Sequence, residues 1–162
     1  MTSPDLIPVY HADTGTIREL RQVVRTDEEW QKILEKNTYD IARKGKTELA
    51  YTGAFYATKN PGLYRCACCG TDLFSSVDKY DSGTGWPGFS RPVSSMNIRI
   101  RPDTGYGMVR TEVICVLCDA HLGHVFDDGP PPTGMRYCIN SASLVFFPGV
   151  IAIRQEYKNS HF

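Results

Sequence analysis

The cysteines constrain this chain more than any other feature, because four of the six fall into two C-x-x-C pairs. The pairs are Cys66/Cys69 and Cys115/Cys118. Two residues between thiols allow a tight turn to bring both sulfurs to one point, and two such turns supply the tetrahedral four-thiolate shell that Zn²⁺ prefers. We therefore expect these cysteines to hold one structural Zn²⁺ between two hairpins that are distant in the sequence.

The alternative for these cysteines is a pair of disulfides or a set of ordinary buried thiols. Residues 1–10 lack the positive segment and apolar run of a secretory signal. No stretch approaches the roughly 18 consecutive apolar residues of a membrane span. The sequence therefore predicts a cytoplasmic protein without a membrane partner. Thiols stay reduced in that compartment, which favours a metal site over disulfides.

The charge balance and the length of the chain limit the classes of function that remain. Eighteen Lys and Arg side chains cancel eighteen Asp and Glu side chains, whereas a nucleic-acid partner needs an excess of positive charge. The 162 residues fit one domain. We expect a monomer with an N-terminal extension over 1–24, a main domain over 25–149 and a C-terminal tail over 150–162.

Helix signals begin at Thr26, and residues 1–24 show no sustained periodicity. Thr26 and Glu29 form the capping-box pattern of a helix N-terminus. The apolar residues that follow fall on one helical face: Trp30, Ile33 and Leu34. A second short helix is expected over 38–44, ended by Gly45.

After these helices the pattern changes to strands. Aromatic and β-branched residues, alternation with polar partners and Pro/Gly turn signals mark five segments: 53–58, 63–66, 96–100, 108–115 and 141–147. Short helices followed by many strands predict an antiparallel β core with helices at one end.

Cys138 lies outside the two pairs. A lone cysteine is more often a small buried hydrophobe than a nucleophile. Arg136 could favour the thiolate, which is the reactive form, and Asn140 offers an amide that can orient a partner. Cys138 is therefore a candidate nucleophile, with core packing as the alternative.

His121 and His124 follow the second cysteine pair at three-residue spacing. A mixed Cys/His metal site is one interpretation, and a pair of hydrogen-bonded core histidines is another. Because four cysteines already fill a zinc shell, both histidines remain free to exchange protons near neutral pH.

Trp86 lies in the glycine-rich loop 83–89, which lacks the lysine and the spacing of a phosphate-binding loop. Glycines beside an indole suit a surface loop that presents an aromatic wall to a small apolar group. Packing of Trp86 in the core is the alternative.

Together these segments resemble the B-type methionine sulfoxide reductases, the MsrB family. Four motifs carry the resemblance in order along the chain: C-A-C-C-G over 66–70, the loop 82–89, C-V-L-C-D-A-H-L-G-H-V-F over 115–126 and R-Y-C-I-N-S-A-S-L over 136–144. The likeness extends from about residue 30 to residue 147.

The resemblance implies a mainly β fold in which two antiparallel sheets form a small zinc-containing β core with short N-terminal helices. It implies a peptide-methionine (R)-S-oxide reductase, with the catalytic domain over 25–149, that repairs oxidised proteins carrying methionine-R-sulfoxide during oxidative stress. In the family pattern Cys138 is the catalytic cysteine, and Trp86 packs on the terminal methyl group of the substrate. The polar lining of the pocket then comprises His121, His124, Asp128, Arg136 and Asn140.

The expected chemistry begins with protonation, because a sulfoxide oxygen leaves poorly without it. His124, helped by His121, is the predicted proton donor. Attack by Cys138 on the sulfoxide sulfur then releases methionine and leaves a sulfenic acid. The sequence departs from many relatives at Thr84, where they carry a resolving cysteine, and at Gly88, where serine is common. We therefore expect an external reductant, either a thioredoxin-like protein or a small thiol.

Two other functions remain open on the sequence alone. A zinc-clasped binding module would show no special reactivity at Cys138. A metal-dependent hydrolase would bind its metal through the histidines and would lose all activity on chelation.

Overall fold

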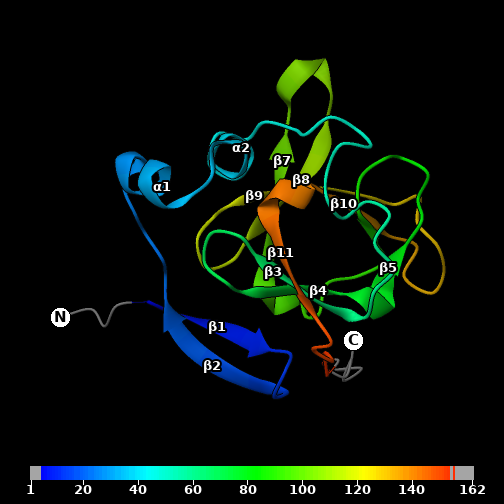
Figure 1. Cartoon of the computed structure of the whole chain (residues 1–162), viewed down its shortest axis with the longest axis horizontal. Coiled ribbons are helices and arrows are strands. Elements are labelled where there is room, and N and C mark those ends of the chain that lie inside the picture. The colour runs from blue at the N-terminus through cyan, green and yellow to red at the C-terminus, as the bar shows by residue number, and fades with distance from the viewer. Residues whose placement is uncertain (1–4, 154, 156–162) are drawn as a thin grey trace.

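The computed structural model describes residues 5–153 and 155. Within them, three antiparallel sheets account for the strands (Figure 1). A six-stranded sheet has the order β5-β6-β10-β9-β8-β7, a three-stranded sheet has the order β11-β3-β4, and the hairpin β1-β2 forms the third. The expected core of two antiparallel sheets is therefore confirmed, with one further hairpin.

The strands are β1 (Leu6–His11), β2 (Thr16–Arg21), β3 (Gly62–Cys66), β4 (Asp72–Ser75), β5 (Lys79–Tyr80), β6 (Gly88–Phe89), β7 (Ile98–Asp103), β8 (Arg110–Cys115), β9 (His121–Phe126), β10 (Arg136–Ile139) and β11 (Leu144–Pro148). The helical segments are α1 (Asp27–Ile33), α2 (Lys36–Thr38), the π-helical turn η1 (Tyr39–Arg43) and the 3₁₀ turns η2 (Ser76–Asp78), η3 (Ser95–Asn97), η4 (Gly105–Gly107) and η5 (Ser141–Ser143).

The hairpin β1-β2 is regular structure within the N-terminal extension, where the sequence shows no sustained periodicity. β1 and β2 pair along their whole length, and Val9, Tyr10 and Ala12 are buried. The buried amide of Asn97 binds both backbone polar groups of Tyr10, each at 2.8 Å. The sequence hides this hairpin because β2 is almost entirely exposed, so its side chains show no inward-facing period.

The N-terminal helix begins as predicted. The Thr26 hydroxyl accepts a hydrogen bond from the Glu29 amide at 3.2 Å, and the Glu29 carboxylate accepts one from the Thr26 amide at 3.0 Å. Trp30 is buried, but Ile33, which was expected on the same face, is 56% exposed. The helix ends at Ile33, and Leu34 turns into extended conformation. Leu34 still packs against the core beside Trp30, so only Ile33 departs from the predicted face.

The second predicted helix, over 38–44, is present as α2 and η1, which together run from Lys36 to Arg43. Four of the five predicted strand segments are confirmed with shifted bounds, in β3, β7, β8 and β11. The fifth, over 53–58, is wrong, because these residues form turns. The Lys79 ammonium donates to the carbonyls of Tyr56 and Thr58 at 3.1 and 2.8 Å.

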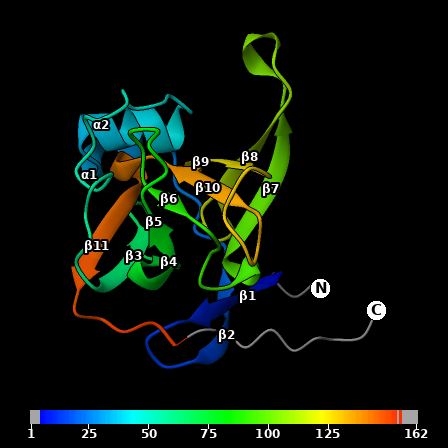
Figure 2. The same ribbon diagram turned by 90° about the vertical axis from the view of Figure 1, so that its right-hand side faces the viewer.

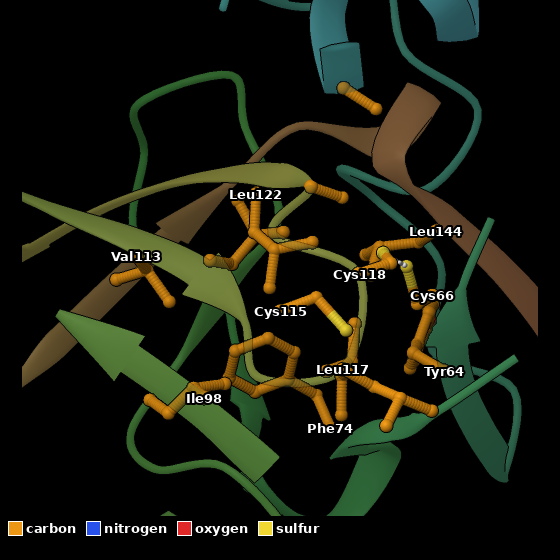
Figure 3. Close-up of a cluster of buried hydrophobic side chains, with 14 of the residues drawn as sticks. Tyr64, Cys66, Phe74, Ile98, Val113, Cys115, Leu117, Cys118, Leu122 and Leu144 are labelled. Atoms are coloured by element: carbon orange, nitrogen blue, oxygen red, sulfur yellow. Dashed lines mark hydrogen bonds between the residues drawn. The ribbon is translucent and has the colours of Figure 1, made fainter. Parts of the chain in front are cut away.

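The core lies between the six-stranded and three-stranded sheets. Phe74 of β4 stacks on Phe89 of β6 with ring centroids 4.5 Å apart, and Tyr64 of β3 meets Phe89 edge-on at 5.2 Å. Figure 3 shows Tyr64 and Phe74 in one cluster with three of the paired cysteines. Burial of such side chains is worth roughly 1.5–3 kcal/mol each, and it fixes the inner strands β9 and β10, which carry the candidate site.

Helices α1 and α2 lie at one end of the molecule and the β1-β2 hairpin at the other (Figure 2). None of the described helices has the length and apolar character needed to cross a membrane.

Candidate active site and metal centre

The two cysteine pairs lie in equivalent turns, residues 66–69 and 115–118, which we call the cysteine turns. In each, the first cysteine ends a strand and the residue after the second adopts a left-handed conformation. Gly70 has φ +81° and Asp119 has φ +60°. Their amides bond back to the carbonyl of the first cysteine at 2.9 and 3.0 Å. The turn geometry expected from the sequence is confirmed.

The four sulfurs of the two C-x-x-C pairs lie within 4.8 Å of one another. The Sγ atoms of Cys66 and Cys118 are 3.7 Å apart, and those of Cys69 and Cys115 are 3.5 Å apart. Four thiolates at about 2.3 Å from a tetrahedral metal ion stand about 3.8 Å from one another. The donor set and its spacing therefore fit one metal ion, and neither histidine belongs to this group.

The thiols of the cysteine turns share protons across the cluster. Hydrogen bonds with Cys115 and Cys118 raise the pKa of the Cys66 thiol, and the bond with Cys115 raises the pKa of Cys118. The acceptor thiol of Cys69 has a lowered pKa, chiefly through its bond with Cys115. A bound cation would replace these protons, because sulfur ligands bind as thiolates.

The second cysteine turn also anchors the N-terminal segments. The Arg43 guanidinium donates to the Cys118 carbonyl at 2.9 Å and lies 4.4 Å from the Trp30 ring centre. The Val23 amide donates to the Leu117 carbonyl at 2.8 Å. The second cysteine turn thus contacts the helical segments through Arg43 and the residues after β2 through Val23.

Cys138 lies in β10, between β6 and β9, and pairs with Gly88 and His124. A Cβ atom on Gly123 of β9 would overlap the Cys138 carbonyl oxygen, so glycine is required for this close approach. A cavity of about 280 Å³ opens at this point. Its walls are Thr47, Thr84, Trp86, Arg110, Gly123, His124, Phe126, Arg136, Cys138 and Asn140.

The structure brings five of the predicted site residues together in this wall: Trp86, His124, Arg136, Cys138 and Asn140. The other two, His121 and Asp128, do not line it, which differs from the expected lining. The His121 ring lies 5.5 Å from the His124 ring, and the Asp128 carboxylate holds Arg136 Nε at 2.8 Å.

Two opposing effects act on the Cys138 thiol. Burial raises the pKa of Cys138, while the Arg136 guanidinium and the Thr84 hydroxyl lower it, and burial prevails. The expected influence of Arg136 is present but is outweighed. Thr84 is the polar neighbour of the thiol, and its hydroxyl is held 2.8 Å from that of Ser82.

His124 is held by a carboxylate that the sequence analysis missed. Its Nε2 lies 2.7 Å from Asp103 Oδ2. Arg110 approaches the same oxygen at 3.3 Å, and the Gly105 amide donates to Asp103 Oδ1 at 2.9 Å. The hydrogen bond with His124 is the main cause of the lowered pKa of Asp103.

His121 has an analogous partner. Its Nδ1 lies 2.5 Å from Glu112 Oε2, and Glu112 also binds Arg101 Nε at 2.5 Å. Burial lowers the pKa of His121, against the pull of Glu112. The role of Glu112 could have been predicted, because it is the one carboxylate in the predicted strand 108–115. The role of Asp103 could not, because the sequence around it predicts a turn.

The Trp86 indole is fixed by the buried residue Glu48. Trp86 Nε1 donates to the Glu48 carbonyl at 3.0 Å, and the Glu48 amide donates to Asn140 Oδ1 at 3.1 Å. Asn140 Nδ2 in turn donates to the Leu122 carbonyl at 3.1 Å. The amide of Asn140 is therefore bound to backbone on both sides and joins the Trp86 wall to β9.

Residues 34–148 match the family model described as the SelR domain. The chain is 57% identical over 120 residues to the peptide methionine sulfoxide reductase MsrB of Acinetobacter baylyi, covering 74% of this chain and 86% of the relative. The chain belongs to the MsrB family. The protein of the same name from Herminiimonas arsenicoxydans is 52% identical over 125 residues, covering 77% of this chain and 91% of the relative.

A third MsrB protein, from Acinetobacter baumannii, is 56% identical over 123 residues. The aligned residues cover 76% of this chain and 88% of the relative. The SelR match contains both cysteine turns and the whole cavity wall. The β1-β2 hairpin lies before the matched residues.

Proposed function

We propose that this MsrB chain is a peptide-methionine (R)-S-oxide reductase whose nucleophile is Cys138. One observation carries the proposal. A half-buried thiol, an indole, a guanidinium and a carboxylate-bound imidazole line a single cavity of about 280 Å³. The family relationship supports the same activity.

The first step transfers one oxygen atom. The Cys138 thiolate attacks the sulfoxide sulfur while His124 delivers a proton to the sulfoxide oxygen. Cys138 is oxidised by two electrons to the sulfenic acid, and the substrate sulfur is reduced to the thioether of methionine. Asp103, bound to His124 Nε2 at 2.7 Å, is the positioning residue for this imidazole. The bond occupies Nε2, so Nδ1 is the nitrogen that exchanges the proton.

The remaining residues position the reactants. Trp86, fixed through its indole N–H, packs on the terminal methyl group of the substrate. Arg136 faces Cys138 and is oriented by Asp128, with its guanidinium 4.3 Å from the centre of the Phe126 ring. Asn140 joins the cavity wall to β9, and His121 supports the ring of His124.

Regeneration requires an external thiol. A thioredoxin-like protein or a small thiol attacks the sulfenic sulfur, water leaves, and a mixed disulfide forms. A second thiol then releases Cys138 and carries away the disulfide. Thr84 offers no sulfur for an internal route, although its hydroxyl contacts Cys138.

We also propose that the metal of the cysteine turns is one structural Zn²⁺. Four thiolates in a closed shell are the ligands of structural zinc. The site lies in the core between the sheets, where Figure 3 shows Cys66, Cys115 and Cys118 among apolar side chains. No cysteine of this group lines the Cys138 cavity, so the ion stabilises the fold and takes no part in oxygen transfer.

The activity is tested with peptides that carry each epimer of methionine sulfoxide, with dithiothreitol as reductant. The R epimer should turn over and the S epimer should not, because the Trp86 wall and the acid of His124 fix the handedness at sulfur. Trp86→Ala should lose at least the roughly 1 kcal/mol of a buried methyl contact, about fivefold in kcat/KM. Equal turnover of both epimers would reject the proposed function.

A further inference from the structure

The hairpin β7-β8 projects beyond the body of the molecule. β7 and β8 pair from Ile98 and Cys115 out to Asp103 and Arg110, and residues 104–109 close the hairpin. In Figures 1 and 2 this end stands clear of the other ribbons. We call residues 103–110 the arm.

The end of the arm is apolar and exposed to solvent. Tyr106 is 93% exposed, Val109 87% and Met108 47%. These three side chains, the arm tip, are close neighbours in sequence on one short loop. Single exposed apolar residues are ordinary, but apolar residues grouped on a projection mark interaction surfaces.

Tyr106 also has an unfavourable backbone. Its φ is +58°, a left-handed conformation that non-glycine residues seldom adopt. Gly105 and Gly107 flank it, so the loop already has residues suited to such a turn. Neither burial nor backbone preference explains a tyrosine here, and strained exposed positions of this kind cluster at functional sites.

The base of the arm belongs to the active site. Asp103 binds His124, and Arg110 forms part of the cavity wall. Val109 directly precedes Arg110, so the backbone joins the arm tip to a residue of the cavity wall. A cavity of about 280 Å³ accommodates one side chain, and the rest of a polypeptide substrate must therefore lie on the surface around its mouth.

We propose that the arm tip docks the polypeptide segment that flanks the methionine sulfoxide. This inference rests on the proposed function. Methionine is an apolar residue that commonly lies among apolar neighbours, so a segment that exposes an oxidised methionine also exposes apolar side chains. Tyr106 and Val109 bury these flanking side chains while the sulfoxide enters the cavity. The arm thus favours unfolded or locally opened proteins over the free amino acid.

The double variant Tyr106→Ser/Val109→Ser tests this docking in the full chain. Three assays are compared: N-acetylmethionine-R-sulfoxide amide with dithiothreitol, an oxidised unfolded protein with dithiothreitol, and the small substrate with thioredoxin. Two truncated apolar contacts should raise KM for the oxidised protein roughly tenfold. Values for the small substrate should stay within about twofold with either reductant. Val77→Ser, at a residue 69% exposed in η2, is the matched control and should change none of the three.

Tyr106→Gly separates docking from folding. Glycine accepts the left-handed backbone, so the thermal midpoint should not fall, while KM for the oxidised protein still rises. An unchanged KM for the protein substrate in both variants would overturn the proposal. If the double variant loses activity only in the assay with thioredoxin, the arm tip binds the reductant instead. That result would also overturn the proposal. Failure of the proposed function is distinct, because the native chain would then reduce none of the substrates.

Discussion

The chain holds cysteine in two contrasting environments, the cysteine turns and the strand β10. The sulfurs of the two cysteine pairs approach one another to 3.5 and 3.7 Å. The sulfur of Cys138 is surrounded by Arg136, Thr84 and a cavity open to a ligand. Converging sulfurs thus have the arrangement suited to metal ligands, whereas a single thiol beside a cation and open space has the surroundings suited to the nucleophile that we propose.

The two environments are mechanically connected. β10 leads through Asn140 into η5, where the Ser143 carbonyl accepts a hydrogen bond from Ala67 of the first cysteine turn at 2.9 Å. Leu144 then pairs with Cys66 at the end of β3. We therefore expect loss of the metal to disturb the structure of the cavity. Substitution of Cys138 should leave the metal site intact.

Loss of the metal should produce the largest effect. Cys118→Ser leaves three thiolates for an ion whose binding is worth on the order of 10 kcal/mol or more, comparable to the whole stability of a domain. We expect insoluble or unfolded protein, measured by circular dichroism and by zinc content after purification. Well under one zinc per chain in the native protein would refute the structural zinc.

The substitution Cys138→Ser should have the opposite effect, a loss of activity with the fold and the metal content unchanged. Turnover of the R-sulfoxide peptide should fall below detection, because a hydroxyl cannot accept the oxygen of a sulfoxide through a sulfenic intermediate. Zinc content and thermal midpoint should equal those of the native chain, since the Sγ atom of Cys138 is no part of the metal centre. Measurable turnover, or a loss of zinc, would contradict the assignment of separate roles to the two cysteine environments.

The cluster of four cysteines could be predicted from the sequence because local geometry determines it. Two C-x-x-C turns with residues that tolerate left-handed backbone at positions 70 and 119 specify their own shape, and the structure confirms both. The capping box at Thr26 is equally local. By contrast, the β1-β2 hairpin depends on a distant contact, the amide of Asn97, and local patterns do not reveal such a partner.

The cavity was predicted less completely for the same reason. Motifs indicated Cys138, Trp86 and His124, but their partners come from elsewhere in the chain. Asp103 reaches His124 because β7 pairs with β8 and β8 pairs with β9. Glu48 reaches Trp86 from a loop without regular structure. Strand register and loop path decide these contacts, and neither is readable from residue types alone.

Asp103→Asn should give the next largest effect. Asparagine keeps the shape but loses the charge that orients His124, so kcat should fall on the order of 10- to 100-fold, part of the 10²- to 10⁴-fold that general acid catalysis contributes. KM for the small substrate should change little. Asp103→Glu should recover part of kcat, as expected for a positioning carboxylate. An equal fall in kcat and thermal stability in both variants would indicate a structural role instead.

Arg136→Gln should have a smaller effect, on the reactivity of Cys138. The guanidinium lowers the pKa of this thiol against burial. The thiolate fraction increases as pH rises through the pKa, so removal of the charge should move the midpoint of the pH profile for iodoacetamide alkylation upward. Arg91→Gln, in an ion pair with Asp78 at 3.2 Å, is the matched control and should leave the midpoint in place. A downward shift in Arg136→Gln would contradict the assignment.

The smallest effect is expected at Cys68, which lies in the first cysteine turn but belongs to neither C-x-x-C pair. It lies between two metal ligands, its thiol interacts with Cys66 and Cys118, and it does not line the Cys138 cavity. A disulfide requires Cα atoms within about 7 Å, so Cys68 could reach Cys138 only if the first cysteine turn moved away from the metal. We therefore expect Cys68→Ser to recycle at the native rate with thioredoxin or a small thiol.

A trapping experiment tests whether Cys68 takes part in the recycling of Cys138. Reduced enzyme receives one equivalent of substrate, free thiols are alkylated at once, and cross-links are mapped by mass spectrometry. Oxidised Cys138 should appear as a sulfenic acid or as a mixed disulfide with the added thiol, and Cys68 should appear alkylated or protected by the metal. A Cys68–Cys138 disulfide that forms as fast as turnover would show that the metal turn opens during catalysis, and the two cysteine environments would then be one functional unit.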